Sequence, residues 1–572
     1  MATIIESDTL IHTERSFKLS AGPGAGKTHW LTLHIKNVIA NGKRLETARR
    51  IACISYTNVG ADTVSDRLPN HSSIVDVSTI HSFLFANVVK PFLFLEAERW
   101  GLDPTQIRVV PIENYLTSAF AHSVLDYIGA TWMSSECMLD GMRKCSWQYK
   151  DHRFSTYKPK YPIKAKNSQG KTTKYYIPQK AYDAFVRLRW DSNCITYDDV
   201  LYLAVELLEL HPEIYNIVVA RYPYFFIDEF QDSIPPIVDL VRCLGERNVI
   251  VGVVGDKAQS IYGFIGASVE QFDSFIVPNM DEYEIRGNRR SSPEIISLLN
   301  IVRPNFVQNS IATSHGSRPV LLIGDRLEAY QHALGDVNGE EVHTLAYPNI
   351  IANSMIYSTQ DDFCDGLIDS DFDSNFERSV AIRSLLKATE YAFHGDLREG
   401  WHQMDAVHPD RAVTIGFLRI LLNKRGDLLT RSLYDYFIFI KSELFPEMPN
   451  LRKGSIMDFY KSHSYRDMAV SMKVADCDAL HKTIHKAKGE EYDNVLLIAG
   501  DDVSFLTQPD IDNNATQRVY YVGMSRARRN LFININKVSR EELKLLSKMP
   551  LIIIYYCCPL NMKSQFEAIV VQ

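Results

Sequence analysis

The chain has few of the cysteine patterns that mark disulfide scaffolds or metal clusters. Nine cysteines are scattered over 572 residues, and no two have the Cys-x-x-Cys spacing. Only Cys557 and Cys558 are adjacent, and a disulfide needs a backbone separation that neighbouring residues rarely reach. We therefore expect reduced, buried thiols and neither a zinc nor an iron–sulfur site.

Long apolar runs and a surplus of positive charge are also missing. No apolar stretch approaches the roughly 18 residues of a membrane span, and the stretch 551–556 (LIIIYY) has the length of a buried strand. The first ten residues, MATIIESDTL, lack the basic region and apolar core of a secretion signal. A net charge of −7 excludes a uniformly basic surface, although it leaves room for a local basic groove. These features predict a cytoplasmic protein.

Short strand-like runs alternate with helical patterns along most of the chain. They lie at 51–56, 224–227, 249–254, 320–323, 495–499 and 531–533. This alternation is typical of parallel sheets covered by helices on both faces. The fold class predicted is α/β, with two doubly wound domains and a long, largely helical insertion in each.

The boundaries follow from where the strand-like runs stop. A chain of 572 residues is too long for one core and should form about three or four domains. The predicted parts are 1–85 with 196–285 for the first domain, 86–195 for its insertion, 286–345 with 471–545 for the second domain, 346–470 for its insertion, and 546–572 for a C-terminal tail.

Residues 21–28 read Ala-Gly-Pro-Gly-Ala-Gly-Lys-Thr and directly follow a strand-like stretch, 17–20. This pattern predicts a phosphate-binding loop, whose backbone N–H groups and following helix face the phosphates. We expect Lys27 to neutralise the β- and γ-phosphates, with no other partner, and the Thr28 hydroxyl to hold Mg²⁺. The alternative, a flexible glycine-rich turn, is disfavoured because Gly26, Lys27 and Thr28 occur together. The predicted lining is Ala21, Gly22, Gly24, Ala25, Gly26, Lys27 and Thr28.

A second element of nucleotide chemistry follows the apolar strand 224–227, which ends in Asp228-Glu229-Phe230-Gln231-Asp232. The carboxyl end of a parallel strand is where α/β sheets build their sites. We expect Asp228 to hold Mg²⁺ and Glu229 to polarise the attacking water.

The two insertions differ in charge. Between 143 and 180 there are eleven Lys or Arg residues and one acid, Asp151, interleaved with seven aromatic residues from Trp147 to Tyr176. Cations beside rings are what single-strand binding requires, and the alternative is a solvated basic loop with the rings packed beneath it. The run 361–377 is acidic but lacks the Gly and Glu of a calcium loop. We interpret it as a solvated loop or a partner surface.

The segment 255–264 (GDKAQSIYGF) completes a set of ordered motifs. With 21–28 and 228–232, it resembles the UvrD/Rep-like branch of superfamily 1 DNA helicases. The resemblance covers both α/β domains but not the insertions. It implies two RecA-like P-loop domains, ATP and Mg²⁺ as cofactors, and a γ-phosphate sensor at Gln259.

The same resemblance extends to segments expected to touch single-stranded DNA. Segments 55–58 (SYTN), 78–83 (STIHSF) and 483–492 (TIHKAKGEEY) are similar to the family's DNA-contacting motifs. The resemblance to this family implies DNA contacts at Tyr56, Thr57, Asn58, Thr79, His81, Tyr262, Phe264 and His485.

Beyond residue 286 the resemblance supplies arginines. Asn288-Arg289-Arg290-Ser291 and the stretch 521–527 (YVGMSRA) are similar to motifs whose arginines reach the γ-phosphate. This implies arginine fingers at Arg290 and Arg526 and a nucleotide contact at Glu491. Arg289 stands where the family has an adenine-stacking tyrosine, although a guanidinium plane also stacks on rings. Residues 1–16 contain no Gln of the family's adenine-reading motif.

The function that these motifs favour is an ATP-dependent helicase or translocase on single-stranded or tailed duplex DNA, moving 3′ to 5′ as the family does. The alternative is a DNA-stimulated ATPase that senses DNA and regulates a nuclease partner without processive unwinding. Compact helicases of this kind resemble those of phage-defence systems such as Gabija. DNA repair and antiviral defence both remain open as pathways.

Overall fold

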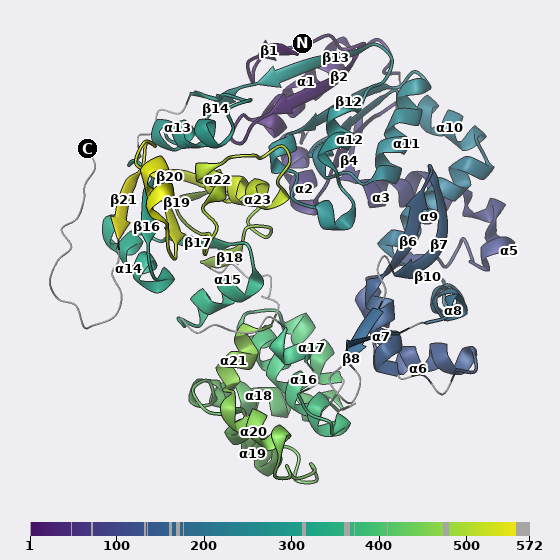
Figure 1. Ribbon diagram of the computed structural model, residues 1–572. Coiled ribbons are helices and arrows are strands. Elements are labelled where there is room, and N and C mark those ends of the chain that lie inside the picture. Colours follow the sequence, from purple (N-terminus) through teal and green to yellow (C-terminus); the bar gives the residue numbers. More distant parts are fainter. Residues whose placement is uncertain are drawn as a thin grey trace. The chain divides into compact units, whose positions relative to one another are not determined.

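The computed structural model describes residues 2–46, 48–69, 73–130, 133, 135–159, 163–166, 172–175, 177–311, 316–359, 366–370, 372–405, 407–408, 410–472 and 480–555. The chain divides into two compact units, Met1–Gly287 and Asn288–Gln572. Each unit contains a parallel sheet flanked by helices (Figure 1), so the predicted α/β class is confirmed.

The first unit is built on a seven-stranded sheet with the strand order β1-β13-β2-β12-β11-β3-β4. All neighbouring strands are parallel. The carboxyl ends of the strands therefore meet at one edge, where the candidate site lies. The strands are β1 Thr3–Ile5, β2 Ser16–Ala21, β3 Ile51–Ser55, β4 Val75–Thr79, β11 Tyr224–Ile227, β12 Ile250–Gly255 and β13 Met280–Ile285.

Alternate residues of the central strands enter different cores on the two faces of this sheet. Ala52 and Ile54 pack in one cluster with α3, α9, α10 and α11, whereas Ile51 and Cys53 pack in another with α1 and α2. This period of two explains why both faces need helical cover. The helices are α1 Lys27–Asn41, α2 Asn58–Asp66, α3 Ile80–Leu84, α9 Tyr197–Leu210, α10 Glu213–Arg221, α11 Pro235–Glu246 and α12 Val269–Asp273.

The insertion of the first unit is mixed rather than mainly helical. Its basic stretch forms two antiparallel hairpins, β6 with β7 and β8 with β9. Its buried residues belong to the same core as one face of the sheet, so the insertion is not an independent folding core. Its main elements are α6 Ser118–Tyr127, α7 Ser135–Lys144, β6 Cys145–Lys150, β7 Arg153–Pro159, β8 Ile163–Lys166, β9 Thr172–Tyr175 and α8 Gln179–Trp190.

The second unit is built on a six-stranded parallel sheet with the order β18-β17-β19-β20-β16-β21. The predicted strand at 551–556 forms β21 at the sheet edge, where Leu551 is buried and Ile552 is exposed; Tyr556 lies outside the described residues. The strands are β16 Val320–Ile323, β17 His343–Ala346, β18 His481–Thr483, β19 Tyr492–Ile498, β20 Ala527–Ile535 and β21 Ile552–Tyr555. The flanking helices are α13 Pro293–Val302, α14 Arg326–Asp336, α15 Asn349–Ile356, α22 Ser504–Thr507, α23 Ala515–Met524 and α24 Arg540–Leu546.

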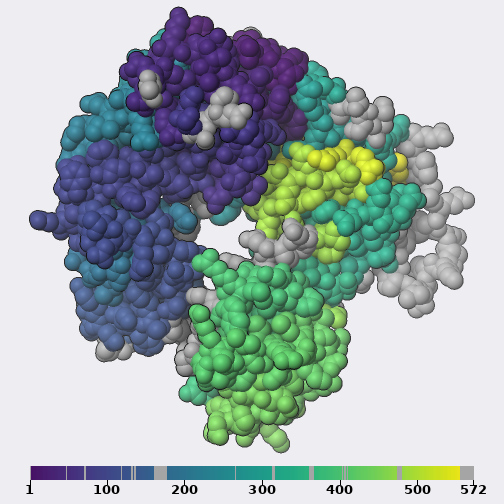
Figure 2. All heavy atoms as spheres, turned by 180° about the vertical axis from the view of Figure 1, so that it is seen from behind, coloured from purple at the N-terminus to yellow at the C-terminus, as the bar shows by residue number. Residues whose placement is uncertain are grey.

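The insertion of the second unit is helical and has a hydrophobic core of its own. Its residues, coloured green, gather into one continuous body in Figure 2. The buried Glu390 accepts hydrogen bonds from Arg425, Tyr357 and Tyr465 at its centre. Its helices are α16 Phe376–Phe393, α17 Leu397–Asp405, α18 Arg411–Leu428, α19 Leu433–Glu443, α20 Ser455–Ser462 and α21 Tyr465–Val470.

The prediction of a solvated acidic loop is wrong for one of its residues. The Asp373 side chain is fully buried and pairs with Arg378 at 2.6 Å, and the Tyr460 hydroxyl donates to it at 2.8 Å. The carboxylate is therefore a structural ion-pair partner, which sequence spacing alone does not reveal. Asp361, Asp362, Asp365 and Asp371 lie outside the described residues.

Candidate functional site

The glycine-rich loop joins the end of β2 to the first turn of α1. Gly24 and Gly26 have φ values of 69° and 82°, a left-handed conformation that glycine adopts without strain. The first turn of α1 contains no acidic residue, and no side chain caps it. The N–H groups at this helix end are thus oriented for an anion, as the sequence predicts for a phosphate loop.

The carboxylates at the end of β11 lie beside this loop. The Lys27 ammonium is 3.1 Å from Glu229 Oε1, and the Thr28 hydroxyl donates to Asp228 Oδ2 at 3.1 Å. The expectation that Lys27 has no partner besides nucleotide is therefore wrong. Glu229 has a φ of 54°, a left-handed conformation that costs a non-glycine residue free energy and is found at functional sites.

The electrostatics of this cluster favour a bound cation. Burial alone would lower the pKa of the Lys27 ammonium, but the charges of Glu229, Asp256 and Asp228 raise it. Burial and then the charge of Glu229 raise the pKa of Asp228 to about 6. The charges of three carboxylates thus act on one ammonium, and a divalent cation would relieve their repulsion.

The donor set fits magnesium shared with a ligand. In the described part of the chain, no three His, Cys, Asp or Glu side chains are clustered as a metal site. Mg²⁺ is commonly held by one or two protein oxygens together with waters and substrate phosphates. Thr28 and Asp228, in hydrogen-bond contact, supply such a pair of oxygens.

A hydrogen-bonded relay connects Glu229 with the segment that follows β12. The Gln231 amide donates to Glu229 Oε2, and its oxygen accepts from the Asp256 N–H at 3.0 Å. The Gln259 amide donates to Asp256 Oδ2 at 2.7 Å. Sequence reasoning selected Gln259 but not Gln231 or Asp256, which are both buried. Their place inside the motifs 228–232 and 255–264 was the available signal.

Aromatic rings selected for DNA stacking gather at the same edge of the first sheet. The rings of Tyr56 and Tyr262 are stacked, with centroids 5.6 Å apart, and Phe264 packs edge-on against Tyr262 at 5.9 Å. The Phe264 side chain is 69% exposed. An exposed ring beside a stacked pair suits the face of a nucleic-acid base.

The polar DNA candidates of this unit have local structural roles as well. Thr57 caps α2 by accepting from the Gly60 N–H at 3.0 Å, and Asn58 begins that helix. Thr79 caps α3 by accepting from the Ser82 N–H at 3.3 Å. His81 packs edge-on against Tyr197, a ring 54% exposed that sequence reasoning missed.

Three aromatic residues of the basic stretch pack against other side chains of the first unit. Trp147 stacks on Tyr202 at 3.7 Å and donates to Asp199, and Tyr157 is buried. Phe154 packs against Tyr202 as well. These three rings follow the alternative, in which they lie beneath a basic surface. Of the other aromatic residues, Tyr161 and Tyr176 lie outside the described residues, as do Lys160 and Lys171.

In the second unit, the arginine-bearing segments are joined to each other. Arg290 donates to the Ser525 carbonyl at 3.0 Å and pairs with Glu491 at 2.6 Å. Glu491 also pairs with Arg528 at 2.8 Å. Burial would raise the pKa of Glu491, but the arginine charges lower it, so the carboxylate is charged at neutral pH.

The other candidates of the second unit differ in burial and in their contacts. Arg526 is buried, and its guanidinium donates to the Val522 carbonyl at 3.1 Å and to Ser525 Oγ at 3.0 Å. The side chain of Arg289 is exposed. His485 lies 5.6 Å from the Tyr347 ring, which is 40% exposed. Ser525 thus contacts both arginines.

Two family models match this chain in order. The UvrD/REP helicase N-terminal domain matches residues 5–278, and the UvrD-like helicase C-terminal domain matches residues 432–538. The chain belongs to the UvrD/REP helicase family. Its two sheets are therefore the RecA-like P-loop folds of that family, as the sequence predicts.

Curated proteins of this family are similar to the chain at modest identity. Gabija protein GajB from Bacillus cereus (strain HuB5-5) is 23% identical over 333 residues, which are 50% of this chain and 47% of GajB. The ATP-dependent DNA helicase PcrA of Staphylococcus aureus (strain Mu50 / ATCC 700699) is 24% identical over 346 residues, 57% of this chain and 42% of PcrA. The match spans about half the length of these relatives.

Membership of this family relates the contacts at the glycine-rich loop to nucleotide binding, but it assigns no role to individual residues of this chain. The predicted UvrD-type nucleotide residues of the first unit lie together at the carboxyl edge of one sheet. Within the described residues, no helix is both long and apolar enough to cross a membrane.

Proposed function

We propose that this chain hydrolyses ATP with Mg²⁺ and uses the energy to move along single-stranded DNA, 3′ to 5′, separating duplex strands ahead of it. The observation that carries the proposal is the meeting of Lys27 with Glu229 and of Thr28 with Asp228 at the end of the first sheet. In a member of the UvrD/REP helicase family, this pairing supports a complete hydrolytic half-site.

Each residue of the half-site has a role that its contacts support. The Lys27 ammonium would leave Glu229 for the β- and γ-phosphates, and this exchange would free the carboxylate to orient the attacking water. Thr28 and Asp228 would hold Mg²⁺, which supplies charge neutralisation at the phosphates. Gln259, held by Asp256, would sense the γ-phosphate. The relay through Gln231, whose carbonyl accepts from the Ser260 hydroxyl at 3.1 Å, would pass that state to the segment that carries Tyr262.

The second unit would complete the site with its arginines. Arg290 and Arg526 would meet the charge that develops on the γ-phosphoryl group, where a planar guanidinium is effective. Arg290 would exchange its pairing with Glu491 for the phosphate. Glu491 would then be available to the ribose and Arg289 to the base. Nucleotide binding and hydrolysis would change the arrangement of the two units. Each unit would in turn bind and release the DNA strand.

Contacts with single-stranded DNA would come from the rings of Tyr56, Tyr262 and Phe264. Thr57, Asn58, Thr79, His81 and His485 would contact the backbone. The stacked rings and the exposure of Phe264 support base stacking. Contact through the basic insertion remains a prediction that rests on its charge.

A second candidate function follows from the similarity to Gabija protein GajB. In this alternative, the chain is a DNA-stimulated ATPase that controls a nuclease partner, in antiviral defence rather than in DNA repair, and it does not unwind processively. The two candidates share the half-site and differ in strand displacement.

Strand displacement on tailed duplexes separates the two candidates. The full chain should release the labelled strand of a 3′-tailed duplex with ATP and Mg²⁺, and a 5′-tailed duplex should remain intact. ATP turnover on DNA without displacement favours the regulatory ATPase. Absence of turnover with either substrate contradicts both.

Arginine variants test whether the second unit completes the site. Arg290→Ala or Arg526→Ala should lower ATP turnover by about 10³-fold or more. Affinity for nucleotide should fall much less, because the charge develops mainly in the transition state. Arg528→Ala, which removes the other partner of Glu491, is the matched control. Normal turnover in both finger variants would mean that the first unit hydrolyses ATP alone.

A further inference from the structure

A hollow of about 720 Å³ lies at the opposite end of the first sheet from the glycine-rich loop. Its described lining comes from the segments before β3 and β4 and from α10: Ala48, Arg50, Ser73, Asn216, Ile217, Ala220 and Arg221. These segments precede their strands, whereas the loop 21–28 and Asp228 follow theirs. Strands of this length hold the two ends about 15 Å apart. A ligand in the hollow would leave the nucleotide edge accessible.

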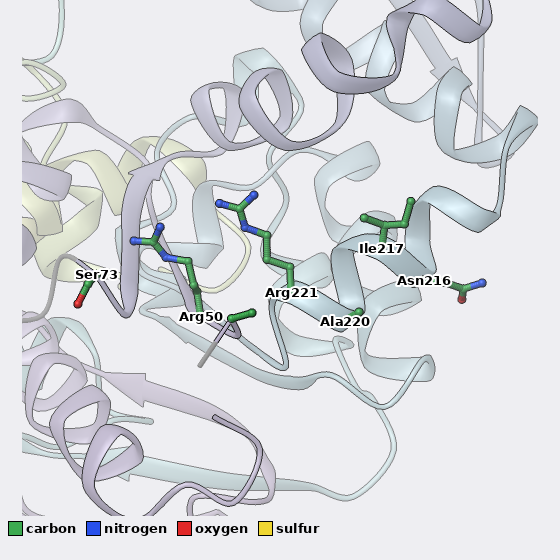
Figure 3. A pocket seen from close by; sticks show the side chains of 7 residues that line it. Arg50, Ser73, Asn216, Ile217, Ala220 and Arg221 are labelled. Atoms are coloured by element: carbon green, nitrogen blue, oxygen red, sulfur yellow. The ribbon is translucent and has the colours of Figure 1, made fainter. Parts of the chain in front are cut away.

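The described lining carries two guanidinium groups and no carboxylate, in a chain whose net charge is −7. Figure 3 shows the side chains of Arg50 and Arg221 pointing to the same side. Their segments are tied together, because the Arg50 N–H donates to the Arg221 carbonyl at 2.7 Å. The two positive charges are therefore held close together by the backbone.

One carboxylate, that of Asp76, already pairs with Arg50 and leaves Arg221 as the arginine available to a ligand. Asp76 Oδ1 pairs with Arg50 at 2.8 Å, and Asp76 Oδ2 accepts from the Tyr222 hydroxyl. Arg221 is 3.9 Å from Asp76 Oδ2 and lies over the Tyr222 ring. The Arg221 side chain is 51% exposed and donates no hydrogen bond to any described residue, so the hollow keeps a net positive charge and a guanidinium fork that is open to a ligand.

Apolar surface lies directly beside this charge. Ile217 on α10 is 51% exposed, and Ala48 and Ala220 are exposed next to it in the lining. Figure 3 shows Ile217 to one side of Arg221, with Arg50 on the other side. Arginine next to exposed aliphatic surface is typical of protein interface centres. A guanidinium also binds a carboxylate in a bidentate manner, through two parallel N–H···O hydrogen bonds. Nucleic acid fits less well, since the described lining offers no ring for base stacking.

We propose that this hollow docks an acidic segment of a partner protein, with a carboxylate on the Arg221 guanidinium and a neighbouring aliphatic side chain against Ile217. Docking there is independent of the proposed motor function, because it uses the other end of the sheet. A partner could thus remain bound while nucleotide and DNA exchange.

A random dodecapeptide library displayed on phage, selected on the immobilised full chain, tests the proposal. Binders that the Arg221→Glu variant also retains are removed by counter-selection. The remaining peptides should combine Asp or Glu with Leu, Ile, Val or Met. Absence of enrichment, or enrichment without an acidic excess, overturns the proposal.

Affinities of one enriched synthetic peptide then locate its site by fluorescence anisotropy. Arg221→Glu should weaken binding about tenfold or more, Arg221→Gln and Ile217→Ser should weaken it less, and added salt should weaken wild-type binding. Arg49→Glu changes the net charge equally beside the hollow, outside the described lining, and should bind as wild type does. Equal binding by Arg221→Glu and wild type, or displacement by a single-stranded oligonucleotide, overturns the proposal.

Folding and motor function are controlled in the same variants. Arg221 is exposed and leaves the Arg50–Asp76 pair intact, so Arg221→Glu should keep the wild-type melting temperature, ATP turnover and DNA affinity. Loss of peptide binding with normal turnover supports the docking site. If the wild-type chain shows no ATP turnover, the proposed motor function is wrong, whereas the conclusion from peptide binding is unaffected.

Discussion

Two buried charge clusters of this chain are arranged in opposite ways. In the helical insertion, the single carboxylate of Glu390 meets the Arg425 guanidinium at 2.9 and 2.8 Å and two tyrosine hydroxyls. At the glycine-rich loop, one ammonium, Lys27, pairs with Glu229 and feels the charges of Asp256 and Asp228. The first cluster is neutral and saturated, whereas the second has surplus negative charge.

The difference separates a structural cluster from a site awaiting a ligand. A buried ion pair whose oxygens are all bonded fixes the packing of its helices, and removal of one partner leaves an unpaired charge. Burial and then the charge of Glu229 raise the pKa of Asp228 to about 6, which is a cost that a bound cation would remove. The left-handed Glu229 adds backbone strain at the same place.

The same chemical change should have opposite consequences in the two clusters. Glu229→Gln should lower ATP turnover by about 10³-fold, because the amide cannot accept a proton from water. Stability should stay within about 0.5 kcal/mol of wild type, since the substitution relieves repulsion among carboxylates. Steady-state turnover and urea denaturation measure both, with the exposed Glu46→Gln as the control. A large loss of stability with normal turnover would assign the cluster to folding.

Glu390→Gln should destabilise the protein by about 3 kcal/mol or more, because Arg425 loses its charged partner inside the insertion. ATP turnover without DNA should remain normal at temperatures where the variant is folded. The matched control is Glu377→Gln, an exposed residue in the first turn of the same helix. Unchanged urea and thermal midpoints in Glu390→Gln would show that the saturated cluster is dispensable.

A buried polar group without charge sharpens the comparison. His34 on α1 stacks on Trp30, its ring nitrogens have no hydrogen-bond partner among the described residues, and burial lowers its pKa to about 4. The unfolded chain binds the proton below pH 6.5 and the folded chain only near pH 4. Stability that is complete above pH 6.5 should therefore fall by about 3 kcal/mol as pH decreases to 4.

His34→Leu should remove that component of the acid dependence. Urea midpoints at pH 7, 5.5 and 4.5 measure it as the difference between wild type and variant. The raised pKa of Asp228 acts with the opposite sign, because folding then favours its protonated form between pH 6 and 4, and it cancels in this difference. If the urea midpoints of wild type and His34→Leu change equally with pH, protonation of His34 does not destabilise the folded protein.

The smallest effect is expected at an exposed hydrogen bond outside both clusters. Thr57→Ala should cost about 1 kcal/mol by removing the cap of α2, whereas Thr57→Ser should retain the cap. DNA affinity of the two variants, compared at equal folded fraction, separates a DNA contact from capping. A loss of affinity in Thr57→Ala but not in Thr57→Ser would support the contact, and unchanged affinity in both would restrict Thr57 to capping.

Local patterns predicted the parts of the fold and site that local chemistry determines. The glycines of 21–28 and the carboxylates after 224–227 are specified by the turn and strand that carry them, so the sequence located the carboxyl edge of the first sheet correctly. The sequence also located central strands of both sheets, because buried parallel strands are short and continuously apolar. It did not locate β4 or β13, most of whose residues are only partly buried.

Contacts between distant residues could not be predicted in this way. Trp147 donates to Asp199 and stacks on Tyr202, both more than fifty residues later in the chain. The composition of the stretch 143–180 does not reveal these partners and therefore suggested an exposed stacking ring. The pairing of Lys27 with Glu229 likewise joins residues far apart in sequence. Burial of Asp373 beside Arg378 depends on helix packing that a run of acids does not encode.

The central claim is that the surplus of carboxylates at the glycine-rich loop belongs to an ATPase controlled by DNA. Steady-state ATP hydrolysis by the full chain, measured with Mg²⁺ in the presence and absence of single-stranded DNA, tests it most directly. The predicted result is turnover that rises several-fold with DNA and is lost in Glu229→Gln. Turnover that is insensitive to both DNA and Glu229→Gln, or no turnover at all, would contradict the account.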